Sequence, residues 1–328
     1  MASHIERRKF LATLGGAAAW PLVARAQQPE RMRRIGVLET TSMALNAANF
    51  EAFRQSLRDL GYIEEQNLII EYRSAEGRGE RFTDLAVDLL RLNIDVIVTR
   101  GTPAVLAAKQ ATTATPIVMA AAGDPLMVVA SLANPGGNIT GLSAYTPGLE
   151  EKRAEVLKEL VPGALRIGGL YNMGNPVVPP LWNELQTAAR KLGLTPQLLD
   201  VRKVEDIAPA FADATSQHAD ALIVSVDALT QKNRSFIAQL AAGHGLPAIY
   251  VSKEFIDAGG LIAYGPHYPD LYRRAAIYVD KILHGASPSS LPVEQPTKFE
   301  LIINVKAARA IGLQVPMALM VRADEVIE

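Results

Sequence analysis

From Arg34 onward, short apolar runs rich in β-branched residues alternate with longer amphipathic stretches. We expect strands at 35–38, 68–70, 96–99 and 116–119, and helices at 47–60, 81–92 and 102–111. Strands that alternate with helices of about ten or more residues predict βαβ units and a parallel sheet covered by helices. Aromatic residues make up only 6% of the chain, which is typical of aliphatic strands buried beneath helices rather than of a sandwich.

The same alternation restarts after the turn-forming run 134–138. We expect helices at 147–160, 176–192, 204–214 and 231–242, and strands at 167–171, 197–199, 221–225, 248–251 and 261–264. About 300 residues exceed what a single hydrophobic core usually holds. The pattern therefore predicts an α/β protein with two Rossmann-like lobes, each built on a parallel sheet and joined to the other by a hinge.

The two lobes are expected to exchange segments of chain. A long helix at 268–284 is expected to return to the first lobe, which then comprises 27–143 plus about 268–290. The second lobe comprises 144–267 plus about 291–328. The sequence leaves open which lobe takes the last strand, at 299–304, and the helix at 307–312.

The N-terminus has the pattern of a cleavable export signal. Arg7 and Arg8 precede an apolar run at 11–23, and Ala24-Arg25-Ala26 places small residues at the two positions that a signal peptidase reads. The paired arginines favour the twin-arginine (Tat) route, and the apolar run is too short to span a bilayer comfortably. We therefore expect residues 1–26 to be removed and the remaining chain to reside in the periplasm.

Composition and motifs exclude several classes of function. The chain has no cysteine, which rules out disulfides, a thiol nucleophile and cysteine-based zinc sites. Its five histidines lack metal-ligand spacing, and no nucleophile elbow, phosphate loop or dinucleotide fingerprint is present. The whole chain carries a formal net charge of −1; removal of residues 1–26, which hold four basic residues and one Glu, would leave −4 and argues against a nucleic-acid partner. We expect no metal, no cofactor and no catalysis.

Ligands of open α/β sheets collect at the carboxyl ends of the strands. Four pairs there join a capping residue to a proline: Thr102-Pro103, Asp124-Pro125, Thr146-Pro147 and Asn175-Pro176. Each pair is expected to start a helix, either as plain capping or as part of a cleft where helix N-termini favour a carboxylate or phosphate.

Charged and aromatic residues at strand ends are further candidates. Arg100 could pair with a ligand carboxylate and Glu39 could receive an amine, although either could equally be a surface residue. Asp227 could accept a hydrogen bond from a ligand or cap the next helix. Tyrosine suits small-ligand sites but is often a packing residue, and three tyrosines are expected near the cleft: Tyr145, Tyr171 and Tyr268.

Five motifs together carry a family resemblance. They are Gly-Thr-Pro-Ala at 101–104, the run 117–125 ending in Asp-Pro, Asn-Pro-Gly-Gly-Asn-Ile-Thr-Gly at 134–141, Gly-Leu-Tyr-Asn at 169–172, and Ala-Ile-Gly-Leu at 310–313 with Pro316. In order and spacing this chain resembles the ABC transporter substrate-binding protein family, some members of which bind tryptophan or tyrosine. The resemblance covers Arg34 to about Glu328.

The resemblance implies a type I periplasmic-binding-protein fold, no catalysis, and a monomer that delivers a small ligand to an ABC permease and its ATPase. It places the ligand between the lobes, against Thr102, Pro103, Ala104, Asp124, Pro125, Tyr171, Asn172 and Asp227. Members that bind aromatic amino acids tend to have a Glu soon after the Tyr-Asn pair, whereas Met-Gly-Asn-Pro follows here at 173–176. Because that Glu is missing and Arg100 could pair with a carboxylate, the expected ligand is either an amino acid or an aromatic or other organic carboxylate.

Three other functions fit parts of the sequence. An exported sensory protein would need a separate membrane partner, and an exported enzyme would need a reaction that no motif indicates. A cytoplasmic sugar-repressor-like regulator would need a helix-turn-helix before Arg34, where the export signal stands instead.

Overall fold

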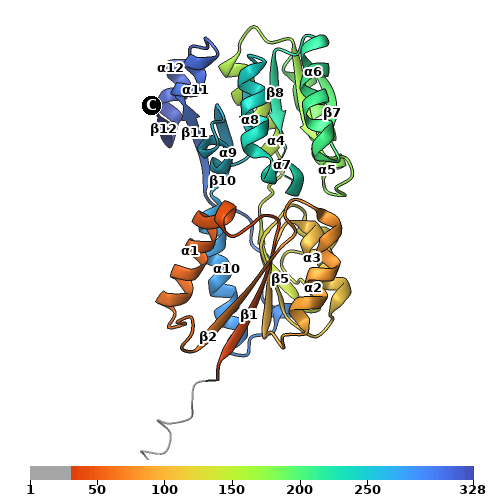
Figure 1. The fold of residues 1–328 in the computed structure, drawn as a ribbon, viewed down its shortest axis with the longest axis vertical. Coiled ribbons are helices and arrows are strands. Elements are labelled where there is room, and N and C mark those ends of the chain that lie inside the picture. The colour runs from red at the N-terminus through yellow and green to blue at the C-terminus, as the bar shows by residue number, and fades with distance from the viewer. Residues whose placement is uncertain (1–30, 226) are drawn as a thin grey trace, which may run out of the picture. The chain divides into compact units, whose positions relative to one another are not determined.

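The computed structural model describes residues 31–225 and 227–328, and Figure 1 shows the fold. The export signal expected at 1–26 lies outside the described residues. From Arg33 to Glu328 the chain forms two α/β lobes, each with its own sheet, which confirms the predicted class.

The first sheet has five strands in the order β2-β1-β3-β4-β5, and every neighbouring pair is parallel. Its strands are β1 (Arg33–Glu39), β2 (Leu68–Ser74), β3 (Val96–Arg100), β4 (Ile117–Ala122) and β5 (Ile139–Ser143). Successive side chains of a strand point to opposite faces. Val96 and Val98 therefore pack beneath α1 (Ala47–Asp59) and α10 (Tyr268–Leu283), while Ile97 faces α2 (Phe82–Leu90) and α3 (Thr102–Ala111).

The second sheet has seven strands in the order β12-β11-β10-β9-β8-β6-β7. Its strands are β6 (Arg166–Tyr171), β7 (Thr195–Asp200), β8 (Ala221–Val224), β9 (Ala248–Tyr250), β10 (Ile262–Pro266), β11 (Phe299–Asn304) and β12 (Glu325–Ile327). All pairs are parallel except β10 with β11. One face packs on α4 (Leu149–Leu160), α5 (Val178–Lys191), α11 (Val305–Ala310) and α12 (Met317–Arg322). The other packs on α6 (Ile207–Ser216), α8 (Arg234–Gly243) and α9 (Lys253–Asp257).

Three short segments join the lobes, at 144–148, at His267 and at 295–298. After α10 the chain stays with the first sheet, because the backbone carbonyl of Leu291 accepts a hydrogen bond from Thr140, and Glu294 bridges to Leu142 of β5. The first lobe therefore extends to Glu294, a few residues beyond the expected limit near 290. The tail then joins the second sheet as β11 and β12.

The expected elements are found with small differences. Helix α3 has the predicted bounds, whereas the helix expected at 231–242 is two helices, α7 (Ala228–Lys232) and α8, which meet at Asn233. Strand β5, helices α9 and α12 and the edge strand β12 were not expected, because each is a run of only a few residues without clear periodicity.

Candidate ligand-binding site

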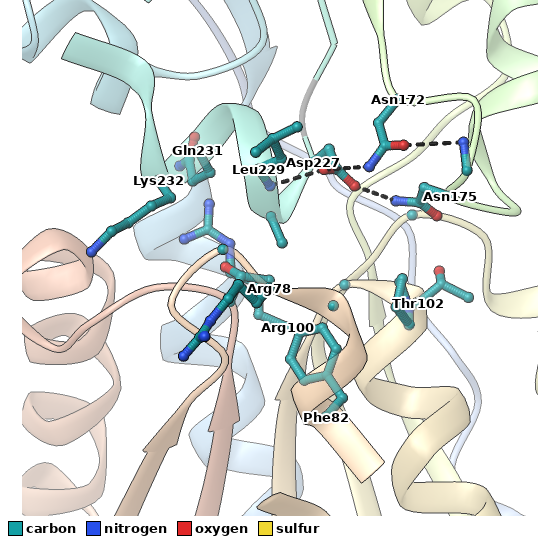
Figure 2. A pocket seen from close by; sticks show the side chains of 18 of the residues that line it. Arg78, Phe82, Arg100, Thr102, Asn172, Asn175, Asp227, Leu229, Gln231 and Lys232 are labelled. Atoms are coloured by element: carbon teal, nitrogen blue, oxygen red, sulfur yellow. Dashed lines mark hydrogen bonds between the residues drawn. The ribbon is translucent and has the colours of Figure 1, made fainter. Parts of the chain in front are cut away.

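A cavity of about 740 Å³ lies between the lobes (Figure 2). Its walls come from segments that follow the carboxyl ends of β2, β3 and β4 in the first lobe and of β6, β7 and β8 in the second. This is where parallel α/β sheets place their ligands. Side chains from Phe82, Pro103, Val177, Leu229 and Tyr268 give the cavity an apolar part that suits a hydrocarbon or an aromatic ring.

The Asp227 cluster, which consists of Asp227, Asn172 and Asn175, forms one polar part of the cavity (Figure 2). The side-chain amides of Asn172 and Asn175 donate to the two Asp227 carboxylate oxygens at 3.0 and 2.8 Å, and the backbone N–H of Leu229 donates at 2.9 Å. All three donors are neutral, and no ion pair within the described part of the chain includes Asp227. The cluster therefore keeps a negative charge that a ligand ammonium group can neutralise.

The Arg100 network, which consists of Arg100, Glu254 and the side chains bonded to them, contributes Arg100 and Gln231 to the wall. Arg100 Nη1 lies 3.0 Å from Glu254 Oε1 and Nη2 lies 3.2 Å from Oε2, an arrangement in which both oxygens are bound. The two side chains are only 5% and 12% exposed. The guanidinium also lies over the Tyr268 ring, 4.7 Å from its centroid. Arg100 lines the cavity, but its charge is already neutralised.

Glu254 receives three further hydrogen bonds. They come from Asn49 Nδ2 at 2.6 Å, from Ser252 Oγ at 2.7 Å and from Gln231 Nε2. Burial raises the pKa of Glu254, but the charge of Arg100 and these hydrogen bonds outweigh burial and hold it below its ordinary value. Glu254 is therefore ionised and fully bonded.

Glu39 does not line the cavity, contrary to its expected role as a receiver of an amine. Its carboxyl group is fully buried and accepts hydrogen bonds from the Tyr272 hydroxyl and the Thr40 N–H. Burial raises the pKa of Glu39 to about 7, with Arg100 opposing the shift. A residue at the end of a strand can face the core under a helix as readily as it faces a cleft, and Glu39 faces α10.

Two of the three expected tyrosines also lie outside the cavity lining. Tyr171 is fully buried; its hydroxyl donates to Glu150 at 2.8 Å and its ring packs edge-on against Trp182. The Tyr145 hydroxyl donates to Glu184. Tyr171 is still within strand β6, so its side chain enters the core, whereas Asn172 lies just beyond the strand and reaches the cavity.

The four capping pairs match their expected roles only in part. Gly101, with φ of 80°, precedes α3 as its N-cap, and the Thr102 hydroxyl instead accepts the N–H of Asp124 at 3.0 Å. Asp124 does cap a turn, by accepting the N–H of Leu126. Helices α4 and α5 begin at Leu149 and Val178, two residues after the prolines of the Thr146 and Asn175 pairs.

Half of the twelve expected ligand contacts lie on the cavity wall: Arg100, Thr102, Pro103, Asn172, Asp227 and Tyr268. The other half do not line it: Glu39, Ala104, Asp124, Pro125, Tyr145 and Tyr171. Ala104 and Pro125 are buried against their own lobe, and Asp124 holds Thr102 in place.

Sequence reasoning missed several lining residues, including Thr40, Phe82 and Gln231. The Thr40 hydroxyl and the Gln231 side-chain carbonyl are buried and have no hydrogen-bond partner among residues 31–225 and 227–328. Buried polar groups are normally bonded, so both are suited to bond a ligand. The sequence indicates Asn175 only as a helix cap, and nothing in it distinguishes Glu254 from a surface carboxylate.

Residues 31–225 and 227–328 contain no group of three or more His, Asp or Glu side chains placed to hold a metal ion. Within them, no helix combines the length and the apolar character needed to cross a membrane.

Comparison with known proteins places this architecture in a family. A tyrosine-binding protein of Clostridioides difficile (strain R20291) is 26% identical over 287 residues, which cover 87% of this chain and 82% of that protein. A crystal structure of a conserved domain protein from Vibrio cholerae is 28% identical, with a TM-score of 0.85, covering 90% of this chain and all of the other. An ABC domain from Streptococcus pneumonia, solved in complex with L-Trp, is 27% identical, with a TM-score of 0.83 and coverage of 90% and 99%.

The family model for ABC transporter substrate binding proteins matches residues 34–327, which is nearly the whole described chain. Together with the two-lobed, mostly parallel α/β architecture, this match gives the chain the type I periplasmic-binding fold. The chain belongs to the ABC transporter substrate-binding protein family.

Proposed function

We propose that this protein is the exported, periplasmic substrate-binding component of an ABC importer, and that it acts as a monomer by binding without turnover. Hinge closure around a ligand is the known behaviour of periplasmic binding proteins, and closure presents a surface that a permease can recognise. The observation that carries the proposal is the cavity between the lobes, whose wall has an apolar part and polar parts that include the Asp227 cluster. Its partners are a membrane permease and an ATPase.

The ligand that fits this cavity best has an amine and an apolar or aromatic group. The Asp227 cluster offers a carboxylate bonded only by neutral donors, and the apolar wall offers Phe82, Val177, Leu229 and Tyr268. The relatives point the same way, since one is named for tyrosine and another was solved with L-Trp. We therefore favour an aromatic amino acid over an organic carboxylate that has no amine.

A ligand carboxylate is best received by neutral groups rather than by Arg100, whose charge is taken by Glu254. The N-terminus of α3 contributes Thr102 and Pro103 to the wall and presents the positive end of its helix dipole.

A ligand screen tests this proposal. Purified protein from Gln27 onward is melted with L-tyrosine, L-tryptophan, tyramine and 3-(4-hydroxyphenyl)propanoate, with sugars and nucleosides for comparison. A ligand at about 100 times its Kd adds about 2.7 kcal/mol of apparent stability. We expect the amine-bearing aromatic compounds to raise the melting temperature. Stabilisation by sugars or nucleosides alone would contradict the ligand class, and turnover of any compound would contradict the binding-only role.

Export is tested separately. Arg7→Lys combined with Arg8→Lys should leave the precursor in the cytoplasm, because the Tat route depends on the paired arginines. Cell fractionation followed by immunoblotting measures this, and unchanged export of the double variant would reject the Tat route.

A further inference from the structure

The buried ion pair of the Arg100 network joins the two lobes. Arg100 is the last residue of β3 in the first lobe, and Glu254 lies on α9 in the second. Both charges come from the chain itself, and Arg100 binds both oxygens of the Glu254 carboxylate. No ligand atom is therefore needed to complete the pair. Figure 2 labels Arg100 and Gln231 among the residues that line the cavity.

Both lobes supply the remaining bonds of this pair. In the first lobe, Asn49 donates to Glu254 at 2.6 Å, and the Asn46 side-chain oxygen accepts from Arg100 at 3.1 Å. In the second lobe, Ser252 and Gln231 donate to Glu254. A carboxylate has about four lone-pair sites, and Glu254 has five donor contacts, so its bonding capacity is used in full. Such complete bonding is the condition under which a buried ion pair offsets its desolvation cost.

We propose that Arg100 and Glu254 form an interlobe latch that prevents Arg100 from binding a ligand carboxylate. Through the protein's own charges, the latch favours the arrangement of the lobes in which this pair is formed, here called the closed form. This inference rests on the proposed function, because it concerns the closure of the same cavity. When the lobes separate, the pair and the Asn49 bond to Glu254 are broken together. A ligand that placed a carboxylate on Arg100 would have to displace Glu254 and leave that buried carboxylate without its cation, which is costly.

The latch has two consequences that differ from those of closure driven by ligand alone. First, part of the population is closed before ligand binds, which reduces the number of contacts that a ligand must supply. Second, Arg100 offers no free charge to an anion that has no amine, because Glu254 already pairs with it.

The test is designed to work without any ligand. The chain has no cysteine, so Asp88→Cys in the first lobe and Asp213→Cys in the second give a unique pair of exposed labelling sites. Distances between spin labels at these sites are measured by pulsed electron resonance in the ligand-free protein. The test variant is Glu254→Gln. The matched control is Asp257→Asn, which makes the same charge change on the same helix at an exposed carboxylate that pairs with Lys253 of that helix.

We expect Glu254→Gln to move the distance distribution toward the open form, while Asp257→Asn leaves it as in the parent. The double variant Arg100→Met/Glu254→Gln leaves neither charge unpaired and should show the same opening, which keeps the test valid if the single variant folds poorly. Distributions that match the parent in both test variants would overturn the latch.

A binding measurement tests the second half of the proposal. Freed from Glu254, Arg100 should bind 3-(4-hydroxyphenyl)propanoate at least about 10-fold more tightly in Glu254→Gln than in the parent, as a new charge-assisted bond allows. No gain would overturn the role of Glu254 in discrimination. If no compound in the screen binds the parent but the lobes still open in Glu254→Gln, the proposed ligand class fails and the latch stands.

Discussion

Two carboxylates of the second lobe, Glu254 and Asp227, serve the cavity region in different ways. Glu254 is paired with Arg100 from the first lobe and is nearly buried, whereas Asp227 accepts only neutral N–H donors and lies on the cavity wall. The difference is the presence of a cation. A paired carboxylate has its charge satisfied inside the protein and can hold two parts of the chain together. A carboxylate held by amides keeps its charge for a ligand.

The largest expected effect comes from removing the cation of the paired site. Arg100→Met leaves Glu254 buried without its partner, and we expect the free energy of unfolding to fall by about 3 kcal/mol, the low end for a broken buried pair because opening of the lobes lets water reach Glu254. Denaturant titration measures this. Asp257→Asn, on the same helix, should change stability by less than about 0.5 kcal/mol. If Arg100→Met and Asp257→Asn were equally stable, Glu254 would not need Arg100 as its cation. Glu254 would then resemble Asp227, which has none.

Removal of the charge at the unpaired site is expected to affect binding rather than folding. Asp227→Asn retains a side-chain oxygen that can cap α7, but it removes the charge that we assign to a ligand amine. Affinity for L-tyrosine or L-tryptophan should fall by about 2 kcal/mol, measured by calorimetry.

Affinity for 3-(4-hydroxyphenyl)propanoate, which has no amine, should change much less in Asp227→Asn. Asp213→Asn, an exposed carboxylate of the same lobe away from the cavity, serves as the control. An equal loss for both compounds would show that Asp227 shapes the site without contacting the amine.

Glu39 adds a third case, a buried carboxyl group that Arg100 influences but that forms no ion pair among the described residues. Its pKa is raised from 4.5 to about 7, so the folded protein holds this proton more tightly than the unfolded chain does. The associated stability is present in full below pH about 4.5 and is lost as the pH rises through about 7. Glu39→Gln has no such loss. As the pH rises from 5 to 7, the free energy of unfolding of the variant should therefore increase relative to that of the parent by up to about 2 kcal/mol.

Unfolding titrations of the parent and Glu39→Gln at several pH values measure this gain. A difference between the two proteins that stays constant with pH would mean that Glu39 is ionised in the folded state, in the manner of Glu254.

The smallest effect is expected at a second ion pair between the lobes. Lys232 Nζ lies 2.7 Å from Glu76 Oε2, and both side chains are more than a third exposed, at 39% and 34%. Exposed pairs contribute about 0–1 kcal/mol and are screened by salt. Glu76→Gln should therefore change stability by less than about 1 kcal/mol at low salt and by nothing measurable at high salt. A larger, salt-independent loss would show that exposure does not distinguish this pair from Arg100–Glu254.

Much of the fold could be read from the sequence because periodicity is a local property. The bounds of α3 and the change from strand to helix after Arg100 follow from residues that are neighbours in the chain. The site was only half predictable for the same reason. Position at a strand end brought Arg100, Asn172 and Asp227 to the cavity, but it could not tell that Glu39 and Tyr171 face the core.

The sequence by itself determined the two-lobed α/β class, the family and the edge of each sheet at which the cavity lies, since these follow from hydrophobic pattern and motif order. Tertiary structure alone decided which charges remain for a ligand. Arg100 and Glu254 are 154 residues apart, and the charge that one retains depends on whether the other lies beside it in the fold. Asp227 keeps its charge because amides, rather than a cation, reach it from the loop after β6. Electrostatic pairing acts through space over a few ångströms, so only the folded chain could assign these two carboxylates their different roles.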